Sequence, residues 1–114
     1  GHIIAVADRD SIIAVSGGSK KELLDKPLSP EVERIIESRE IFIAQSTDNN
    51  KIPVIADDKG GNKYTCQVIS PIIAEGDAIG AVIMLSTDPE AKMGDVETKL
   101  VQSAAGFLGR HMEQ

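Results

Sequence analysis

Residues 64–87 constrain the fold more than any other part of the chain. They contain two apolar runs joined by a turn with Gly76 and Asp77, a pattern typical of a β-hairpin. The second run, residues 79–85, has almost no polar alternation. Because a strand with one face in water alternates polar and apolar residues, this run predicts a central strand covered on both faces. The sequence therefore favours a sheet between helices.

Further strands are predicted on either side of this hairpin. The sequence of residues 3–6 recurs unchanged as residues 12–15, and the turn residues 8–10 lie between the two copies, which indicates a second hairpin. Residues 41–44 read as a short strand, whereas residues 52–55 are ambiguous between a strand and an extended lid. Pro71 has no amide hydrogen to donate, so the outer neighbour of its strand should stop before that point.

Two polar segments between the predicted strands are expected to be loops or turns. Residues 46–51 are polar throughout and predict a loop. Residues 57–63 contain a glycine pair and predict a turn.

Three helices have start signals. Ser19 and Glu22 have the spacing of a capping box, and Ser29 followed by Pro30 is typical of an N-cap and a first helical residue. Asp95 can cap a last helix that runs to about residue 112. The apolar stripe of the middle helix consists of Val32, Ile35 and Ile36.

These elements predict an α+β fold in a single domain over residues 2–114. We expect an antiparallel sheet of five or six strands, with the last helix on one face and the other two helices near the opposite face. A formal net charge of −6 argues against direct contact with a nucleic-acid backbone. Cys66 is the only cysteine, which excludes an internal disulfide and fits a reducing cytosol.

The hairpin and the last helix together resemble a known family. Residues 70–73, the run from Gly76 to Leu85 and the terminal amphipathic helix are similar to the end of a GAF domain, a small-molecule-sensing relative of PAS domains. With the opening hairpin included, the chain resembles the C-terminal domain of the stage V sporulation protein T family of bacterial regulators. That family joins an AbrB-like DNA-binding module to a GAF domain, so the resemblance implies a regulatory domain of a sporulation transcription factor in the forespore cytoplasm.

The resemblance implies a ligand site between the sheet and residues 19–63. The residues that we expect to contact a small molecule are Ser46 and Thr47 in the polar loop and Tyr64 and Cys66 on one face of a strand. The alternative is an ordinary loop over a filled core, in a structural module that senses nothing. No cofactor or metal is expected, and the chain lacks the NKFDE motif of cyclic-nucleotide GAF domains.

Catalysis is not expected. His2 and His111 have no other metal ligands at a suitable spacing. Cys66 lacks the second thiol that reduction of methionine sulfoxide requires, so we interpret it as a buried strand residue.

The last helix carries an assembly signal. Two adjacent apolar stripes make a face wider than packing on a sheet requires, and the surplus suits a second helix. We expect a homodimer through this helix, and the full-length protein could form a higher oligomer. The alternative is that the helix is broadly buried within one domain. The expected interface residues are Leu100, Ala104, Phe107, Leu108 and His111.

Overall fold

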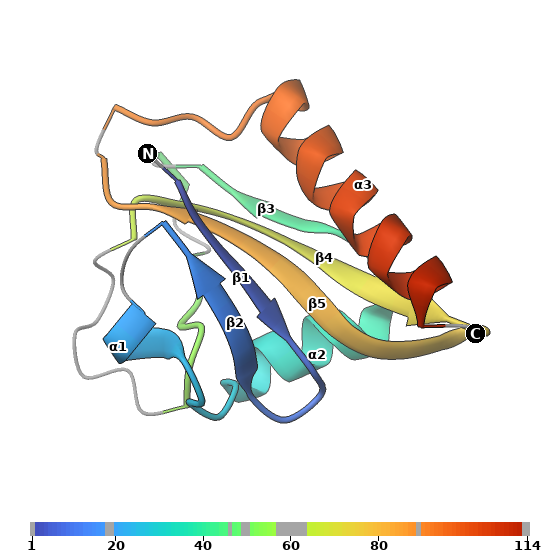
Figure 1. Cartoon of the computed structure of the whole chain (residues 1–114). Helices are drawn as coiled ribbons and strands as arrows, with labels where there is room; N and C mark the ends of the chain where they lie inside the picture. Colours follow the sequence, from blue (N-terminus) through green and yellow to red (C-terminus); the bar gives the residue numbers. More distant parts are fainter. Residues whose placement is uncertain are drawn as a thin grey trace.

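The computed structural model describes residues 2–17, 20–45, 47–48, 51–56, 64–88 and 90–112. Within these ranges one antiparallel sheet has the strand order β2-β1-β5-β4-β3 (Figure 1). The fold is α+β, and the sheet has five strands, the lower of the two expected numbers. The strands are β1 (Ile3–Ala7), β2 (Ile12–Ser16), β3 (Phe42–Ala44), β4 (Cys66–Ala74) and β5 (Asp77–Ser86).

The helices cover both faces of the sheet, as the sequence predicts. The short helix α1 (Lys20–Leu23) and α2 (Pro30–Ser38) lie on one face, here called the α2 face. The long C-terminal helix α3 (Asp95–His111) packs across β4 and β5 on the opposite face, here called the α3 face (Figure 1). The sheet therefore separates two hydrophobic cores.

Strand β5 is the central strand and is buried on both sides. It pairs with β1 along one edge and with β4 along the other. Ile83 and Leu85 belong to the α2-face core, whereas Val82 and Met84 belong to the α3-face core. This confirms the prediction from its unbroken apolar sequence, because β5 is buried on both faces from Gly80 to Ser86.

Local signals set the ends of the other elements. Ser29 caps α2 by accepting a hydrogen bond from the Val32 amide at 3.1 Å. Strand β3 pairs with β4 only as far as Ile69, so it stops before Pro71, as expected. The expected turn at residues 57–63 and the capping residue Ser19 lie outside the described residues.

The start of α3 corrects one prediction. Gly94, not Asp95, is the N-cap residue, and its amide donates to Oε1 of Glu97 at 2.8 Å. Asp95 is the first helical residue. Its carboxylate and that of Glu97 still favour the helix, because both lie at the positive end of the helix dipole.

Close packing of α3 on the sheet depends on a glycine. A Cβ atom built on Gly109 would lie 2.1 Å from the carbonyl oxygen of Ile73, which is backbone and cannot move aside. At Gly106, on the same helix, the nearest atom would be the flexible end of Arg110 at 3.4 Å. The two glycines therefore have different roles, since only Gly109 fixes the distance between α3 and β4.

This difference gives a matched pair of variants. Gly109→Ala should lower the free energy of unfolding by about 1–3 kcal/mol, because the added methyl group overpacks the contact. Gly106→Ala should instead raise it by up to about 1 kcal/mol, since alanine favours the helix. Urea denaturation followed by circular dichroism measures both changes. Equal effects of the two substitutions would show that α3 does not lie this close to the sheet.

Candidate functional site

An irregular stretch of chain lies over the α2 face. We call residues 51–56 the cover segment. Val54 is buried in the α2-face core, and Ile52 and Ile55 pack against this core. The cover segment belongs to the region in which the GAF resemblance places a ligand. Among the residues the structure describes, apolar side chains fill the space beneath it.

Hydrogen bonds fasten the cover segment to the start of α2. The Ser29 hydroxyl donates to the Pro53 carbonyl oxygen at 2.6 Å, and the Ser29 amide donates to the Val54 carbonyl oxygen at 3.0 Å. The Ala56 amide donates to the Pro27 carbonyl oxygen at 2.9 Å. Ser29 thus caps α2 and holds the cover segment with the same side chain.

Gln67 of β4 holds the cover segment from below. Its side chain is 1% exposed and contacts both backbone groups of Ile52. The Ile52 amide donates to Oε1 at 3.1 Å, and Nε2 donates to the Ile52 carbonyl oxygen at 2.6 Å. This two-point contact reproduces a strand-like pairing, and it satisfies a buried amide that would otherwise be costly.

The expected ligand residues do not form one group. Thr47 is exposed, Tyr64 is buried in the α2-face core and Cys66 is buried in the α3-face core, while Ser46 lies outside the described residues. The prediction that Tyr64 and Cys66 share a face was wrong. Tyr64 precedes β4, and the chain bends at Thr65, so the alternation of a strand does not extend back to it.

Cys66 lies instead beside the segment that precedes α3. Its Sγ donates to the Ala91 carbonyl oxygen at 3.8 Å. Burial raises the pKa of the Cys66 thiol, while the hydrogen bond of Thr65 and the charge of Lys51 act in the opposite direction. A thiol that keeps its proton is a weak nucleophile, which agrees with a packing role.

Gln45 makes a second two-point contact, on the α3 face. Its side chain binds the backbone of Met93, the residue before the N-cap of α3. The Met93 amide donates to Oε1 at 2.9 Å, and Nε2 donates to the Met93 carbonyl oxygen. Sequence reasoning singled out neither Gln45 nor Gln67.

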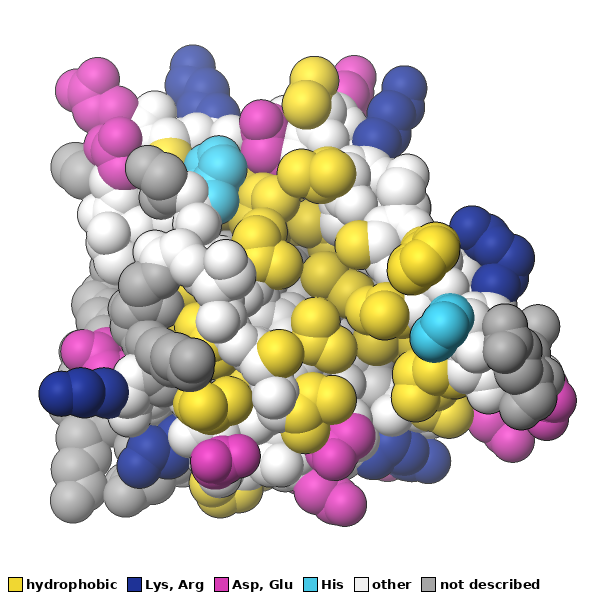
Figure 2. Space-filling model, viewed as in Figure 1, with side chains coloured by type: hydrophobic (Ala, Val, Ile, Leu, Met, Phe, Trp, Pro, Cys, Tyr) yellow, Lys and Arg dark blue, Asp and Glu magenta, His cyan; other side chains and the backbone are white. Residues whose placement is uncertain are grey.

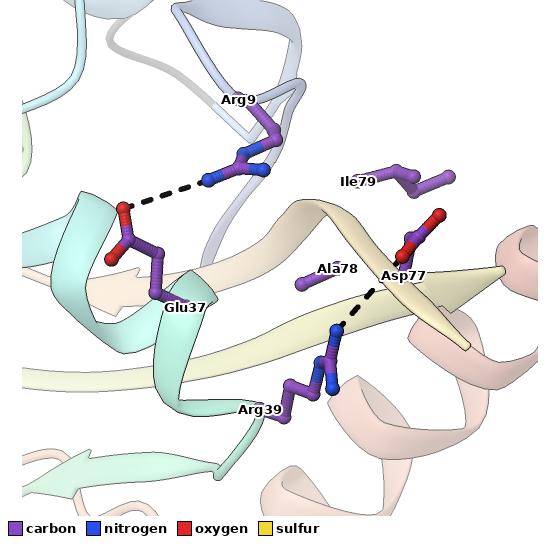
Figure 3. A pocket seen from close by; sticks show the side chains of 6 residues that line it. All are labelled: Arg9, Glu37, Arg39, Asp77, Ala78 and Ile79. Atoms are coloured by element: carbon purple, nitrogen blue, oxygen red, sulfur yellow. Dashed lines mark ion pairs between the residues drawn. The ribbon is translucent and has the colours of Figure 1, made fainter.

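An open pocket of about 470 Å³ lies at the other end of the sheet, between the β1–β2 turn, the end of α2 and the start of β5 (Figure 3). Arg9 lies 3.5 Å from Glu37, and Arg39 lies 4.0 Å from Asp77. All four side chains are more than half exposed, and such pairs contribute little to stability. The pocket is lined by these four charged residues with Ala78 and Ile79.

One apolar stripe of α3 faces outward. Val96, Leu100 and Phe107 are 75%, 58% and 62% exposed. The Phe107 ring stacks on His111 with centroids 6.0 Å apart. Val101 and Ala105 of the adjacent stripe are buried.

The expected interface residues divide between these two stripes. Leu100, Phe107 and His111 are exposed, while Ala104 and Leu108 are partly buried against the α3-face core.

The apolar surface extends from α3 onto the sheet. Helix α3 packs on β4 and β5, and on the β1–β2 side of the same face Ile4 and Val6 are only partly buried. Ile13 of β2 is 51% exposed. Figure 2 shows hydrophobic side chains gathered across this face of the molecule, up to the edge of α3. Such a continuous apolar patch is typical of an interaction surface.

The part of the chain that the structure describes has neither a metal site nor a membrane-spanning helix. No group of three or more His, Cys, Asp or Glu side chains there is arranged to hold a metal ion. No helix within those ranges is long and apolar enough to cross a membrane.

Comparison with known proteins identifies relatives of the whole chain. A family described as "Stage V sporulation protein T C-terminal, transcription factor" matches residues 1–113. The chain is 44% identical over 114 residues to stage V sporulation protein T of Bacillus subtilis (strain 168). The match covers all of this chain but only 61% of that relative, so the chain spans about three fifths of its length.

Solved structures of the same fold are more distant in sequence. The GAF domain/HD domain protein from Geobacter sulfurreducens matches with a TM-score of 0.64 and 22% identity over 97% of this chain and 81% of that one. The cyanobacteriochrome receptor PixJ matches with a TM-score of 0.72 and 14% identity over 98% of this chain and 83% of that one. At these identities the likeness shows a GAF-like fold alone.

The buried thiol predicts a pH dependence. The pKa of the Cys66 thiol is higher in the folded state than in the unfolded chain. The free energy of unfolding therefore falls as the pH rises above the ordinary pKa of a thiol, because the unfolded chain loses this proton first. The urea midpoint of the wild type should therefore fall between about pH 8 and pH 10 more steeply than that of Cys66→Ala, which lacks the group. Parallel midpoint curves would contradict the burial of the thiol.

Proposed function

Since the chain belongs to the stage V sporulation protein T C-terminal family of transcription factors, we propose that it is a regulatory domain that binds a small molecule and thereby modulates DNA binding by another part of the protein. The negative net charge supports this division of roles, because a DNA-contacting surface needs clustered Lys and Arg. In this account the domain acts without catalysis. A ligand modulates DNA binding only if its affinity differs between two states of the protein.

The observation that carries the proposal is the way the α2 face is covered. The cover segment is irregular and is held by side-chain hydrogen bonds and by one isolated antiparallel bridge, Leu28 with Ile55, rather than by a continuous ladder. Segments held in this way open at lower free energy than core strands. We therefore assign the ligand to the space beneath the cover segment, next to Tyr64, and we keep Thr47, in the exposed loop that precedes this segment, as a proposed second contact. Cys66 has no part in this site, because the sheet lies between it and Tyr64.

The competing function is a structural module that joins DNA-binding modules and binds no ligand. Its support is the filled α2-face core, in which Val54 and Tyr64 are both buried. The two functions differ in one property, since only the sensing domain gains stability from a specific compound.

We also propose that two copies associate through the α3 face as a symmetric dimer. The support is the exposed stripe of α3 together with the apolar surface that continues onto β1 and β2. Phe107 and Leu100 would lie at the centre of the contact. In a symmetric interface each residue contributes twice, so one large exposed side chain has a strong effect on affinity.

A thermal-shift screen tests ligand binding. We expect one compound among amino acids, nucleotides and other small metabolites to raise the melting temperature saturably, since a ligand at a hundred times its dissociation constant adds about 2.7 kcal/mol of stability. Thr47→Ala should weaken this response, whereas Arg39→Gln in the open pocket should not. Loss of the response in Arg39→Gln alone would assign the ligand to the pocket instead. No response to any compound would favour the structural module.

Light scattering over a dilution series tests the dimer. Wild type should be dimeric in the micromolar range, and Phe107→Glu should be a folded monomer, because burial of such a side chain contributes about 1.5–3 kcal/mol to association on each side. Leu108→Glu should mainly lower the stability of the fold, since Leu108 packs against the α3-face core. Gln102→Glu, at an exposed polar position on the same helix, is the control. A monomeric wild type, or a dimeric Phe107→Glu, would contradict the assignment.

A further inference from the structure

The two-point contacts of Gln45 and Gln67 lie on opposite faces of one edge of the sheet. Ala44 of β3 pairs with Gln67 of β4, so these two residues share the α2 face. Gln45, the next residue, has the opposite orientation and contacts Met93 on the α3 face. The contact that holds the cover segment and the contact that precedes α3 therefore lie one register position apart, on opposite faces of the sheet.

Hydrogen bonds also connect the two contacts along the chain. The Lys51 ammonium group, at the start of the cover segment, donates to the Asp48 carbonyl oxygen at 3.0 Å. Asp48 in turn binds Gln45 twice: its carboxylate accepts from the Gln45 amide at 2.8 Å, and its amide donates to the Gln45 carbonyl oxygen at 3.0 Å. A displacement of the cover segment is therefore connected to the backbone of Gln45 through Lys51 and Asp48.

The Gln45 contact bears on the start of α3. Met93 is 2% exposed in the α3-face core and immediately precedes Gly94, the N-cap residue. The amide of Thr98 donates to the Gly94 carbonyl oxygen at 3.0 Å. The first turn of α3 therefore begins at the residue that directly follows Met93. A shift of the Met93 backbone would therefore displace the N-terminus of the helix whose outer stripe is exposed.

We propose that Gln45 and Gln67 are positioning residues that couple the cover segment to the N-terminus of α3. A ligand that displaces the cover segment would then shift α3 and change the affinity of one copy of the chain for another. This effect on assembly rests on the proposed function, but the coupling itself does not. Both contacts replace ladder pairing with a side-chain amide, so each segment has its own opening equilibrium that the other biases.

Amide hydrogen exchange in two variants tests the coupling. In each variant, exchange is measured at the residue on the opposite face of the sheet. Gln67→Met removes the contact with Ile52 directly, and it should also speed exchange at Met93, on the far side of the sheet, about fivefold to tenfold, the effect of about one net hydrogen bond. Gln45→Met should have the converse effect at Ile52, because coupling is reciprocal. Gln102→Met is the control, and the Ile83 amide in central β5 is the reference for global unfolding.

Two results would overturn the proposal. In one, each substitution speeds exchange only at the residue that it contacts, with the remote amide behaving as in Gln102→Met. In the other, the remote amide and Ile83 speed up equally, which is global opening rather than coupling. The measurement uses neither ligand nor dimer, so its failure is separate from a failed compound screen or a monomeric wild type. Gln45 is less buried than Gln67, so Gln45→Met is expected to fold more readily than Gln67→Met. If Gln67→Met does not fold, exchange at Ile52 in Gln45→Met still tests the coupling.

Discussion

The burial of β5 on both faces is the constraint on which the rest of the structure depends. A strand with this sequence is stable only between two cores, so the sheet needs helices on both sides. The α2 face and the α3 face are consequently isolated from each other by a packed sheet. Gln45 and Gln67 offer a route between a ligand on one face and a partner on the other, because their contacts lie on opposite faces at the β3–β4 edge.

The parts of the fold that the sequence predicts are those with local patterns. The apolar run of β5, the Ser29-Pro30 helix start and the last helix each arise from neighbouring residues, and the structure confirms these elements. The sequence also contains the two apolar stripes of α3. The sequence pattern did not decide which of the two stripes faces the sheet and which faces outward. Packing decides it, because Gly109 lets α3 approach Ile73 and so turns Val101 and Ala105 inward and Phe107 outward.

Apart from the one-residue shift of the α3 N-cap from Asp95 to Gly94, the errors and omissions concern long-range contacts. Tyr64 and Cys66 were expected on one face, but Thr65 bonds to the Ser86 carbonyl oxygen and bends the chain just before β4 begins. The partners of Gln67 and Gln45 lie 15 and 48 residues away in sequence, and no periodic pattern marks either glutamine. Placement of the ligand residues depends on such contacts, whereas the existence of two apolar stripes on α3 follows from helical periodicity.

The central claim is that this domain converts binding on one face into a change of assembly on the other. Sedimentation equilibrium of the wild-type chain, with and without the compound that stabilises it most in the thermal screen, measures this most directly. The account predicts that the dimer dissociation constant changes at least about fivefold when the compound is saturating, which is the lower end of typical coupling between sites. A compound that binds saturably and leaves the dissociation constant unchanged would contradict it.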